Sequence, residues 1–216
     1  MKNLIIIDHP LIKRDLTTLR ARETGSHLFR TTLRRIASVM AFEVTRDLKL
    51  TTHRVRTPLE VTAGYSLADS IVIVPVLRAG LGLVEGFLDF LPEARVGHVG
   101  LYRNERTLEP VDYYSKFPAS LERSVVLLLD PMLATGGSGS AAITFLKNKG
   151  ARRIRFVTLL AAPAGVRRVV ADHPGVRIFS CVLDRQLNSR GYILPGLGDA
   201  GDRIFGTEET ASSRDS

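Results

Sequence analysis

The segment from Val125 to Ser138 constrains the fold of this chain more than any other part of the sequence. Five consecutive apolar residues, Val125 to Leu129, are typical of a buried strand in a parallel sheet. Asp130 ends that strand, and a loop of small residues, 134–138, leads into a helical pattern. Glycines in such a loop let backbone N–H groups point at one phosphate, and the helix start adds partial positive charge. Because the carboxylate suits sugar hydroxyls rather than phosphate, the segment predicts a sugar-phosphate site.

Strands and helices alternate along most of the chain. The predicted strands are 71–74, 96–101, 125–129, 154–160 and 176–182, and the predicted helices are 26–47, 80–90, 137–149 and 163–172. Residues 52–63 alternate around Pro58, which is barred from a central strand, and therefore predict an exposed hairpin or arm. The pattern predicts an α/β fold, a parallel sheet flanked by helices, with ligands beyond the carboxyl ends of the strands. Length and apolar content support a single domain, residues 1–216.

The charge of +8 is concentrated at the N-terminus, where residues 1–56 hold twelve Lys or Arg against five Asp or Glu. One interpretation is a surface for nucleic acid or another anion. The other is a set of solvated helix faces, which the scarcity of aromatic residues for base stacking favours.

The single cysteine and the N-terminal residues bear on where in the cell the protein is expected. Cys181 has no cysteine partner in the chain, which fits a reducing cytoplasm, and its setting predicts a buried strand residue. The apolar run before Asp8 is too short for a signal peptide or a membrane span.

Four segments together resemble one protein family. Residues 130–138, Asp-Pro-Met-Leu-Ala-Thr-Gly-Gly-Ser, resemble the phosphoribosyl-pyrophosphate (PRPP) motif of type I phosphoribosyltransferases in its uracil phosphoribosyltransferase form. The others are residues 74–82, 101–105 and 191–202, the last reading Gly-Tyr-Ile-Leu-Pro-Gly-Leu-Gly-Asp-Ala-Gly-Asp. All occur in the family's order, and the resemblance covers about residues 9–207.

The resemblance implies transfer of the phosphoribosyl group of PRPP to uracil, giving UMP and pyrophosphate in pyrimidine salvage. It implies an N-terminal helix, a β-arm and a C-terminal hood loop for the base, added to the parallel sheet. Two alternatives stay open: a phosphoribosyltransferase for another base, and an RNA-binding regulator that keeps the fold.

The family's residues map onto this sequence motif by motif. Asp130, Arg103 and Asp199 are the implied catalytic residues. The implied PRPP-binding set is Arg78, Ala79, Gly80, Arg103, Asp130, Pro131, Met132, Leu133, Ala134, Thr135, Gly136, Gly137, Ser138 and Asp199. The uracil-binding set is Ile193, Gly198, Asp199 and Ala200. Within the first set, residues 134–138 form a phosphate loop for the 5′-phosphate and Asp130 faces the ribose hydroxyls.

Three further expectations concern the surroundings of PRPP. Residues 103–116 are polar after an apolar strand and predict a mobile lid that brings Arg103 to the pyrophosphate. The resemblance implies a strained peptide at Arg78-Ala79-Gly80, which is a candidate for the cis form. Mg²⁺ is expected on the pyrophosphate rather than on the protein, because no His, Cys or Asp cluster has ligand spacing and Mg²⁺ prefers phosphate oxygens.

The resemblance also implies a homodimer or tetramer, with the arm 52–63 packed on a second subunit. A nucleotide effector such as GTP is a further implication, although no motif places it. The polar tail, residues 207–216, is expected to fray.

Overall fold

A parallel sheet forms the centre of the computed structural model, which describes residues 3–103, 110–119 and 121–207, with backbone alone at 101–103 and 110–113. The strand order is β1-β11-β10-β8-β4-β5, and the short β9 also pairs with β10. The strands are β1 (Leu4–Ile6), β4 (Ser70–Pro75), β5 (Arg95–Val96), β8 (Ser124–Leu129), β9 (Met132–Leu133), β10 (Arg153–Ala161) and β11 (Arg177–Leu183). Every pairing among them is parallel, which confirms the predicted fold class.

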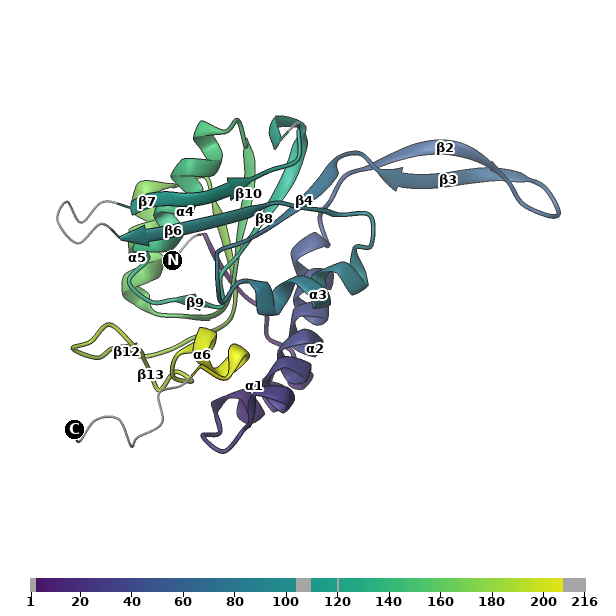
Figure 1. The fold of residues 1–216 in the computed structure, drawn as a ribbon. Helices are drawn as coiled ribbons and strands as arrows, with labels where there is room; N and C mark the ends of the chain where they lie inside the picture. The colour runs from purple at the N-terminus through teal and green to yellow at the C-terminus, as the bar shows by residue number, and fades with distance from the viewer. Residues whose placement is uncertain (1–2, 104–109, 120, 208–216) are drawn as a thin grey trace.

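Helices cover both faces of this sheet (Figure 1). On one face lie α1 (Pro10–Arg20), α2 (Ser26–Thr45) and α3 (Leu81–Phe90), and on the other lie α4 (Gly137–Asn148) and α5 (Pro163–Asp172). Successive strand residues point to opposite faces. Thus Leu127 and Val157 belong to the core on the α2 side, while Leu128 and Phe156 belong to the core on the α4 side. Burial on both faces explains why the strands are continuous apolar runs.

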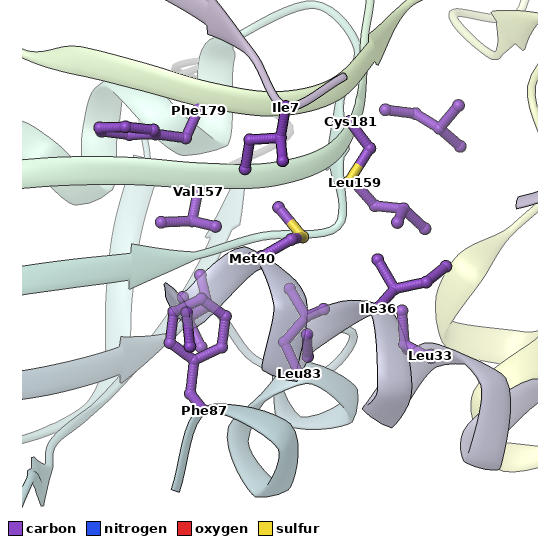
Figure 2. Packing of buried hydrophobic residues seen from close by; sticks show 14 of the residues in the cluster. Ile7, Leu33, Ile36, Met40, Leu83, Phe87, Val157, Leu159, Phe179 and Cys181 are labelled. Atoms are coloured by element: carbon purple, nitrogen blue, oxygen red, sulfur yellow. The ribbon is translucent and has the colours of Figure 1, made fainter. Parts of the chain in front are cut away.

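Figure 2 shows the core between the sheet and helices α2 and α3. Met40 of α2 and Phe87 of α3 belong to one cluster with Val157 and Phe179 of the sheet. Cys181 points into the same cluster and is buried, as its sequence setting predicts, and burial raises the pKa of its thiol.

One predicted strand is divided in two. Residues 96–101 belong to β5 and to β6 (His98–Arg103), and β6 stays beside the main sheet through the Leu77 amide, which donates to Val99 O at 2.9 Å, while it also begins a separate ribbon. Gly97 lies at the break, where an added Cβ would come within 2.7 Å of Phe117 Cδ1. β6 pairs antiparallel with β7 (Pro110–Lys116), so the ends of the predicted lid are ribbon, while its middle, residues 104–109, lies outside the described residues.

The predicted arm is a hairpin and is longer than expected. β2 (Leu50–Arg56) pairs antiparallel with β3 (Val61–Leu67), and the hairpin projects away from the sheet (Figure 1). Pro58 lies in the turn, where Thr57 Oγ1 accepts hydrogen bonds from the amides of Leu59 and Glu60 at 3.2 and 3.0 Å.

The C-terminal part, residues 184–206, lies at the carboxyl edge of the sheet beside α1 and is called the hood below (Figure 1). It contains β12 (Gln186–Leu187), β13 (Ile193–Leu194) and α6 (Ala200–Phe205). The resemblance implied a hood loop here, and the β12–β13 hairpin and α6 are elements that it did not include. Outside the hood, η1 (Leu121–Arg123) forms a single helical turn before β8. Of the predicted tail, residues 208–216 lie outside the described residues.

Candidate active site

The site lies where the order of the strands reverses. From β4 the chain moves outward to β5 and later returns to β8 on the other side of β4. Such a switch point leaves a crevice at the carboxyl ends of the two strands. The loops there touch, because the Val76 amide donates to Leu129 O at 2.9 Å. An added Cβ at Gly80 would lie 2.4 Å from the same carbonyl oxygen, so only glycine permits this approach.

Asp130 follows β8 at this crevice. Its amide donates to Val157 O at 3.0 Å, and its Oδ1 accepts from the Met132 amide at 3.2 Å. Burial raises the pKa of Asp130 to about 6, against the lowering effect of the Met132 hydrogen bond. A carboxylate offers about four acceptor positions, so most of its hydrogen-bonding capacity is left for ligand hydroxyls.

Contacts with β10 and with α5 hold the phosphate loop in place. The strand before the loop, β9, pairs with β10, and the Leu133 amide donates to Thr158 Oγ1 at 3.1 Å. Gly136 has φ of 81° and precedes α4. An added Cβ at Gly136 would lie 2.8 Å from Gly165 O of α5, and one at Gly165 would lie 2.6 Å from Ala134 O. The first-turn amides of α4 have no acceptor inside the helix and can therefore bind an anion.

A polar cluster around the buried side chains of Ser140 and His173 supports the first turn of α4. Ser140 Oγ donates to Asp172 Oδ2 at 2.6 Å, and His173 Nε2 lies 2.9 Å from Ser140 O. Lys147 Nζ lies 3.1 Å from His173 Nδ1. Because an ammonium only donates, Nδ1 accepts and Nε2 carries the proton. His173 is 5% exposed and acts as a structural residue that links α4 to the end of α5.

Arg78 extends from the loop after β4 toward the hood. The Leu77–Arg78 peptide is cis, so the unusual peptide expected in this segment lies one residue before the Arg78–Ala79 bond. The guanidinium lies 3.4 Å from Asp202 Oδ1 and over the Phe205 ring. A pyrophosphate bound at this loop would therefore compete with Asp202 for Arg78.

A pocket of about 330 Å³ joins the two loops to the hood. Its lining residues from the loops are Ala79, Met132 and Ala134, and those from the hood include Ile193, Gly198, Asp199 and Ala200. All four residues predicted for uracil therefore share one cavity with parts of the predicted PRPP site. Asp199 Oδ1 also accepts from the Asp202 amide at 3.0 Å and so caps α6. Arg190 and Tyr192 line the pocket as well and were not predicted.

The other predicted site residues either lie beside this pocket or have side chains outside the described part of the chain. Arg78, Gly80, Asp130, Pro131, Leu133 and residues 135–138 do not line it. They lie on the loops that supply its wall. Arg103 ends β6, and its side chain is outside the described part of the chain, as is Arg106 of the predicted lid.

Arginines hold the hood in place, and sequence analysis missed them. Arg20 of α1 binds both carboxylate oxygens of Asp184 at 2.7 and 2.9 Å and donates to Gly196 O at 2.8 Å. Arg203 of α6 donates to the carbonyls of Leu19, Leu197 and Ala21. Apart from the bond to Leu197, these bonds join segments more than 150 residues apart, so no local pattern could have revealed them.

The basic N-terminal region is largely used within the fold. Arg14 and Arg35 bind Asp15, Arg34 binds Asp89, and Arg30 donates to Ile204 O. These contacts favour the interpretation as structural helix faces. In residues 3–103, 110–119 and 121–207, no three His, Cys, Asp or Glu side chains gather as metal ligands. Nor does that part of the chain contain a helix long and apolar enough to span a membrane.

Known proteins match this chain over nearly its whole length. Residues 6–207 match the family described as Uracil phosphoribosyltransferase. Proteins named uracil phosphoribosyltransferase from Finegoldia magna and Salinibacter ruber are 53% and 50% identical, over 96% and 97% of this chain and all of each relative. A solved structure from Aquifex aeolicus has a TM-score of 0.89 at 38% identity, covering 96% of this chain and all of that one. The adenine phosphoribosyltransferase of Trypanosoma brucei shares the fold, with a TM-score of 0.58 at 14% identity over 85% of this chain and 84% of that one.

Proposed function

Because this chain belongs to the uracil phosphoribosyltransferase family, we propose that it transfers the phosphoribosyl group of PRPP to uracil, giving UMP and pyrophosphate in pyrimidine salvage. The observation that carries the proposal is the shared pocket, in which Ala79, Met132 and Ala134 face the hood residues predicted for uracil. The relatives from Salinibacter ruber, Finegoldia magna and Acholeplasma laidlawii carry the uracil name, which favours neither an RNA-binding regulator nor transfer to another base.

In the proposed complex the phosphate loop and the first turn of α4 bind the 5′-phosphate, and Asp130 accepts hydrogen bonds from the ribose hydroxyls. The loop at Arg78 to Gly80 receives the pyrophosphate. Uracil occupies the hood side of the pocket, with Asp199 beside the ribose or the attacking nitrogen. The bond from the anomeric carbon to pyrophosphate breaks as the bond to the base nitrogen forms, through an oxocarbenium-like transition state, and the proton of that nitrogen is released to solvent. The protein's contribution is alignment of two substrates and stabilisation of the leaving polyanion.

Magnesium belongs to this proposal as part of the substrate. The described residues of the site offer single carboxylates, at Asp130, Asp199 and Asp202, rather than a cage of ligands. Since Mg²⁺ prefers phosphate oxygens and retained waters, the pyrophosphate of PRPP is the fitting carrier. Arg78 and, by family resemblance, Arg103 would then meet a partly neutralised leaving group.

We also propose a homodimer or tetramer built through the arm. Every residue of β2 is exposed, and Leu59 at the turn is 95% exposed. Leu50, Val55, Val61 and Tyr65 add apolar surface to a two-stranded ribbon, which is marginally stable in water by itself. Light scattering at micromolar concentration tests this, and a monomer would contradict it. A Leu59→Ser, Val61→Ser variant should shift the wild-type assembly toward monomer.

Regulation and location complete the proposal. The family resemblance supports a nucleotide effector such as GTP, which is tested by measuring UMP formation across GTP concentrations at limiting PRPP. A cytoplasmic location is supported by the buried free thiol of Cys181. Fractionation of cells that express the protein would test it.

The deciding experiment incubates the protein with PRPP, Mg²⁺ and each free base in turn. The expected product is UMP from uracil, dependent on Mg²⁺. Turnover of purine bases without turnover of uracil would overturn the proposed function.

A further inference from the structure

A second pocket lies at the opposite edge of the sheet from the candidate active site. It has a volume of about 490 Å³ and forms where the parallel strands begin, at Val125 of β8, Arg153 of β10 and Arg177 of β11. The segment after α2 and the last turn of α4 complete its wall. Its size falls in the range of about 300–1,000 Å³ typical of small-molecule pockets.

The charge of this basic pocket is strongly unbalanced. Six cationic side chains line it against two carboxylates, Asp47 and Asp69. The cations are Lys49, Lys147, Arg152, Arg153, Arg155 and Arg177. Concentrated positive charge inside a concave wall focuses the electrostatic field and attracts anions.

The two carboxylates are already used by arginines of the pocket. Asp47 binds Arg155 and Arg177, with both N–O distances 2.7 Å, and Asp69 binds Arg153 through both of its oxygens. No carboxylate among the described residues lies within ion-pair distance of Arg152 or Lys147. The excess positive charge therefore has no counterpart in the described part of the protein.

The environment of Arg155 shows that the protein holds this cationic cluster in a defined arrangement. Arg155 is 8% exposed, and its guanidinium donates to Val44 O as well as to Asp47. Burial lowers the pKa of Arg155, Asp47 opposes the shift, and repulsion from Arg177 and Arg153 adds to it. Bound negative charge in the pocket would relieve that repulsion.

We propose that the basic pocket binds a short polyphosphate chain, free or carried by a nucleotide. Guanidinium groups pair with phosphate oxygens in bidentate geometry, and the volume admits more than one phosphate. None of the residues that line the pocket is aromatic, so a base would find no stacking partner. The phosphates therefore dominate recognition, and nucleoside triphosphates with different bases bind with similar affinity. This inference stands apart from the proposed transfer reaction, since the site lies at the other edge of the sheet.

Calorimetric titration with inorganic tripolyphosphate tests the site, with PRPP and Mg²⁺ present to occupy the candidate active site. The variants are Arg152→Gln and the double variant Arg152→Gln, Lys49→Gln, both at lining positions outside the described hydrogen-bond network. Arg167→Gln, on the exposed face of α5, is the matched control for loss of one arginine. Loss of a charge-assisted contact predicts about tenfold weaker binding for Arg152→Gln and a larger loss for the double variant. The control should bind like the wild type.

The other ligands distinguish the sources of the phosphate chain. Similar affinities for tripolyphosphate, ATP and GTP, all reduced by the double variant, are the expected result. Equal binding by wild type and double variant would overturn the site, as would no binding of tripolyphosphate. A strong preference for one nucleotide would contradict recognition through phosphates. Tighter, variant-sensitive binding of an RNA oligonucleotide would reassign the surface to nucleic acid. None of these results depends on whether uracil is turned over.

Discussion

The phosphate loop and the hood hold the two ends of the proposed substrates by different means. The phosphate loop follows β8 by way of β9 and is fixed by the backbone pairing of β9 with β10 and by the close contact of Gly136 with Gly165. The hood is fixed by side chains, since Arg20 and Arg203 tie it to α1. One region is thus held by backbone contacts with β10 and α5, and the other by side-chain contacts that span most of the chain. It follows that PRPP binding and uracil binding should be separable by mutation.

The largest effect is expected at the loop end, from Asp130→Asn. The substitution keeps the size of the side chain and removes the charge near the ribose and its developing positive charge. We expect kcat/KM to fall by about 10²-fold or more, the scale of one lost preorganised electrostatic contact. Steady-state kinetics with PRPP and uracil measure it, and near-normal values would refute the role of Asp130.

The same carboxyl should set the acidic limb of the pH profile. With a pKa of about 6 in the folded protein, Asp130 loses its charge below that pH. In a one-proton limb kcat/KM falls about tenfold per pH unit, so the expected loss near pH 5 is about tenfold. PRPP titrates too, and Asp130→Asn is therefore the control, because only the limb due to the enzyme disappears in it. If the acidic limb persisted unchanged in Asp130→Asn, the group that titrates would be PRPP or another residue.

Protonation of Asp130 at low pH is expected to lower activity but to raise the free energy of unfolding. The raised pKa of Asp130 means that the folded state binds this proton more tightly than the unfolded state, whose pKa is near 3.8. The partly desolvated charge therefore lowers the free energy of unfolding above about pH 6, and this cost disappears as the pH falls toward 4. The carboxylate is retained at a cost in stability, as is common where function requires a buried charge.

At the hood end, Arg203→Met keeps the apolar length of the side chain and removes its donors. Arg203 is 8% exposed and stacks on the Phe29 ring, so the lost carbonyl contacts are largely shielded from water. Hydrogen bonds from charged groups are worth about 1.5–3 kcal/mol each, which corresponds to at least about a tenfold rise in the KM for uracil. The KM for PRPP should change little. Equal rises in both KM values would show that the two regions are not separable.

Gly165→Ala makes the converse change at the phosphate loop. The new Cβ would lie 2.6 Å from Ala134 O and 2.7 Å from Leu133 O, so the loop or α5 must shift. We expect the KM for PRPP to rise several-fold, up to about tenfold for 1.4 kcal/mol of misfit, while uracil binding is retained. Gly175→Ala is the matched control, because nothing lies within 4 Å of its added Cβ. A loss confined to uracil would reverse the proposed division.

The same division explains what the sequence could predict. The runs 125–129 and 154–160 were recognised as strands because burial on both faces selects apolar residues at every position. The split of residues 96–101 depends on how Gly97 packs on Phe117, which spacing does not reveal. Likewise, the predicted uracil residues were placed by resemblance, whereas Arg203 was invisible because its acceptor Leu19 lies 184 residues away.

The smallest effect, and the sharpest test of the hood, is expected from Ile193→Val. Ile193 lines the pocket and is 3% exposed, so one lost methylene costs about 0.5–1.5 kcal/mol and weakens uracil binding by no more than about tenfold. The choice against cytosine should not change. Uracil accepts a hydrogen bond at position 4, where cytosine donates two, and we expect a backbone N–H of residues 198–201 to face that position. These residues line the pocket, and the cap of α6 and the bond from Arg203 to Leu197 O fix their backbone.

A fixed backbone donor cannot rotate to suit cytosine, whereas a side-chain amide could. A buried donor without an acceptor costs about 1–3 kcal/mol, and several failed contacts together give discrimination of about 10⁴-fold. Rejection of cytosine should therefore survive both Ile193→Val and the larger cavity of Ile193→Ala, although the latter binds uracil less well. The measurement is the ratio of kcat/KM for uracil and cytosine in each variant. If Ile193→Ala accepted cytosine as a good substrate, the shape of the side chain would govern specificity, and the hood would select its base by packing rather than by its backbone.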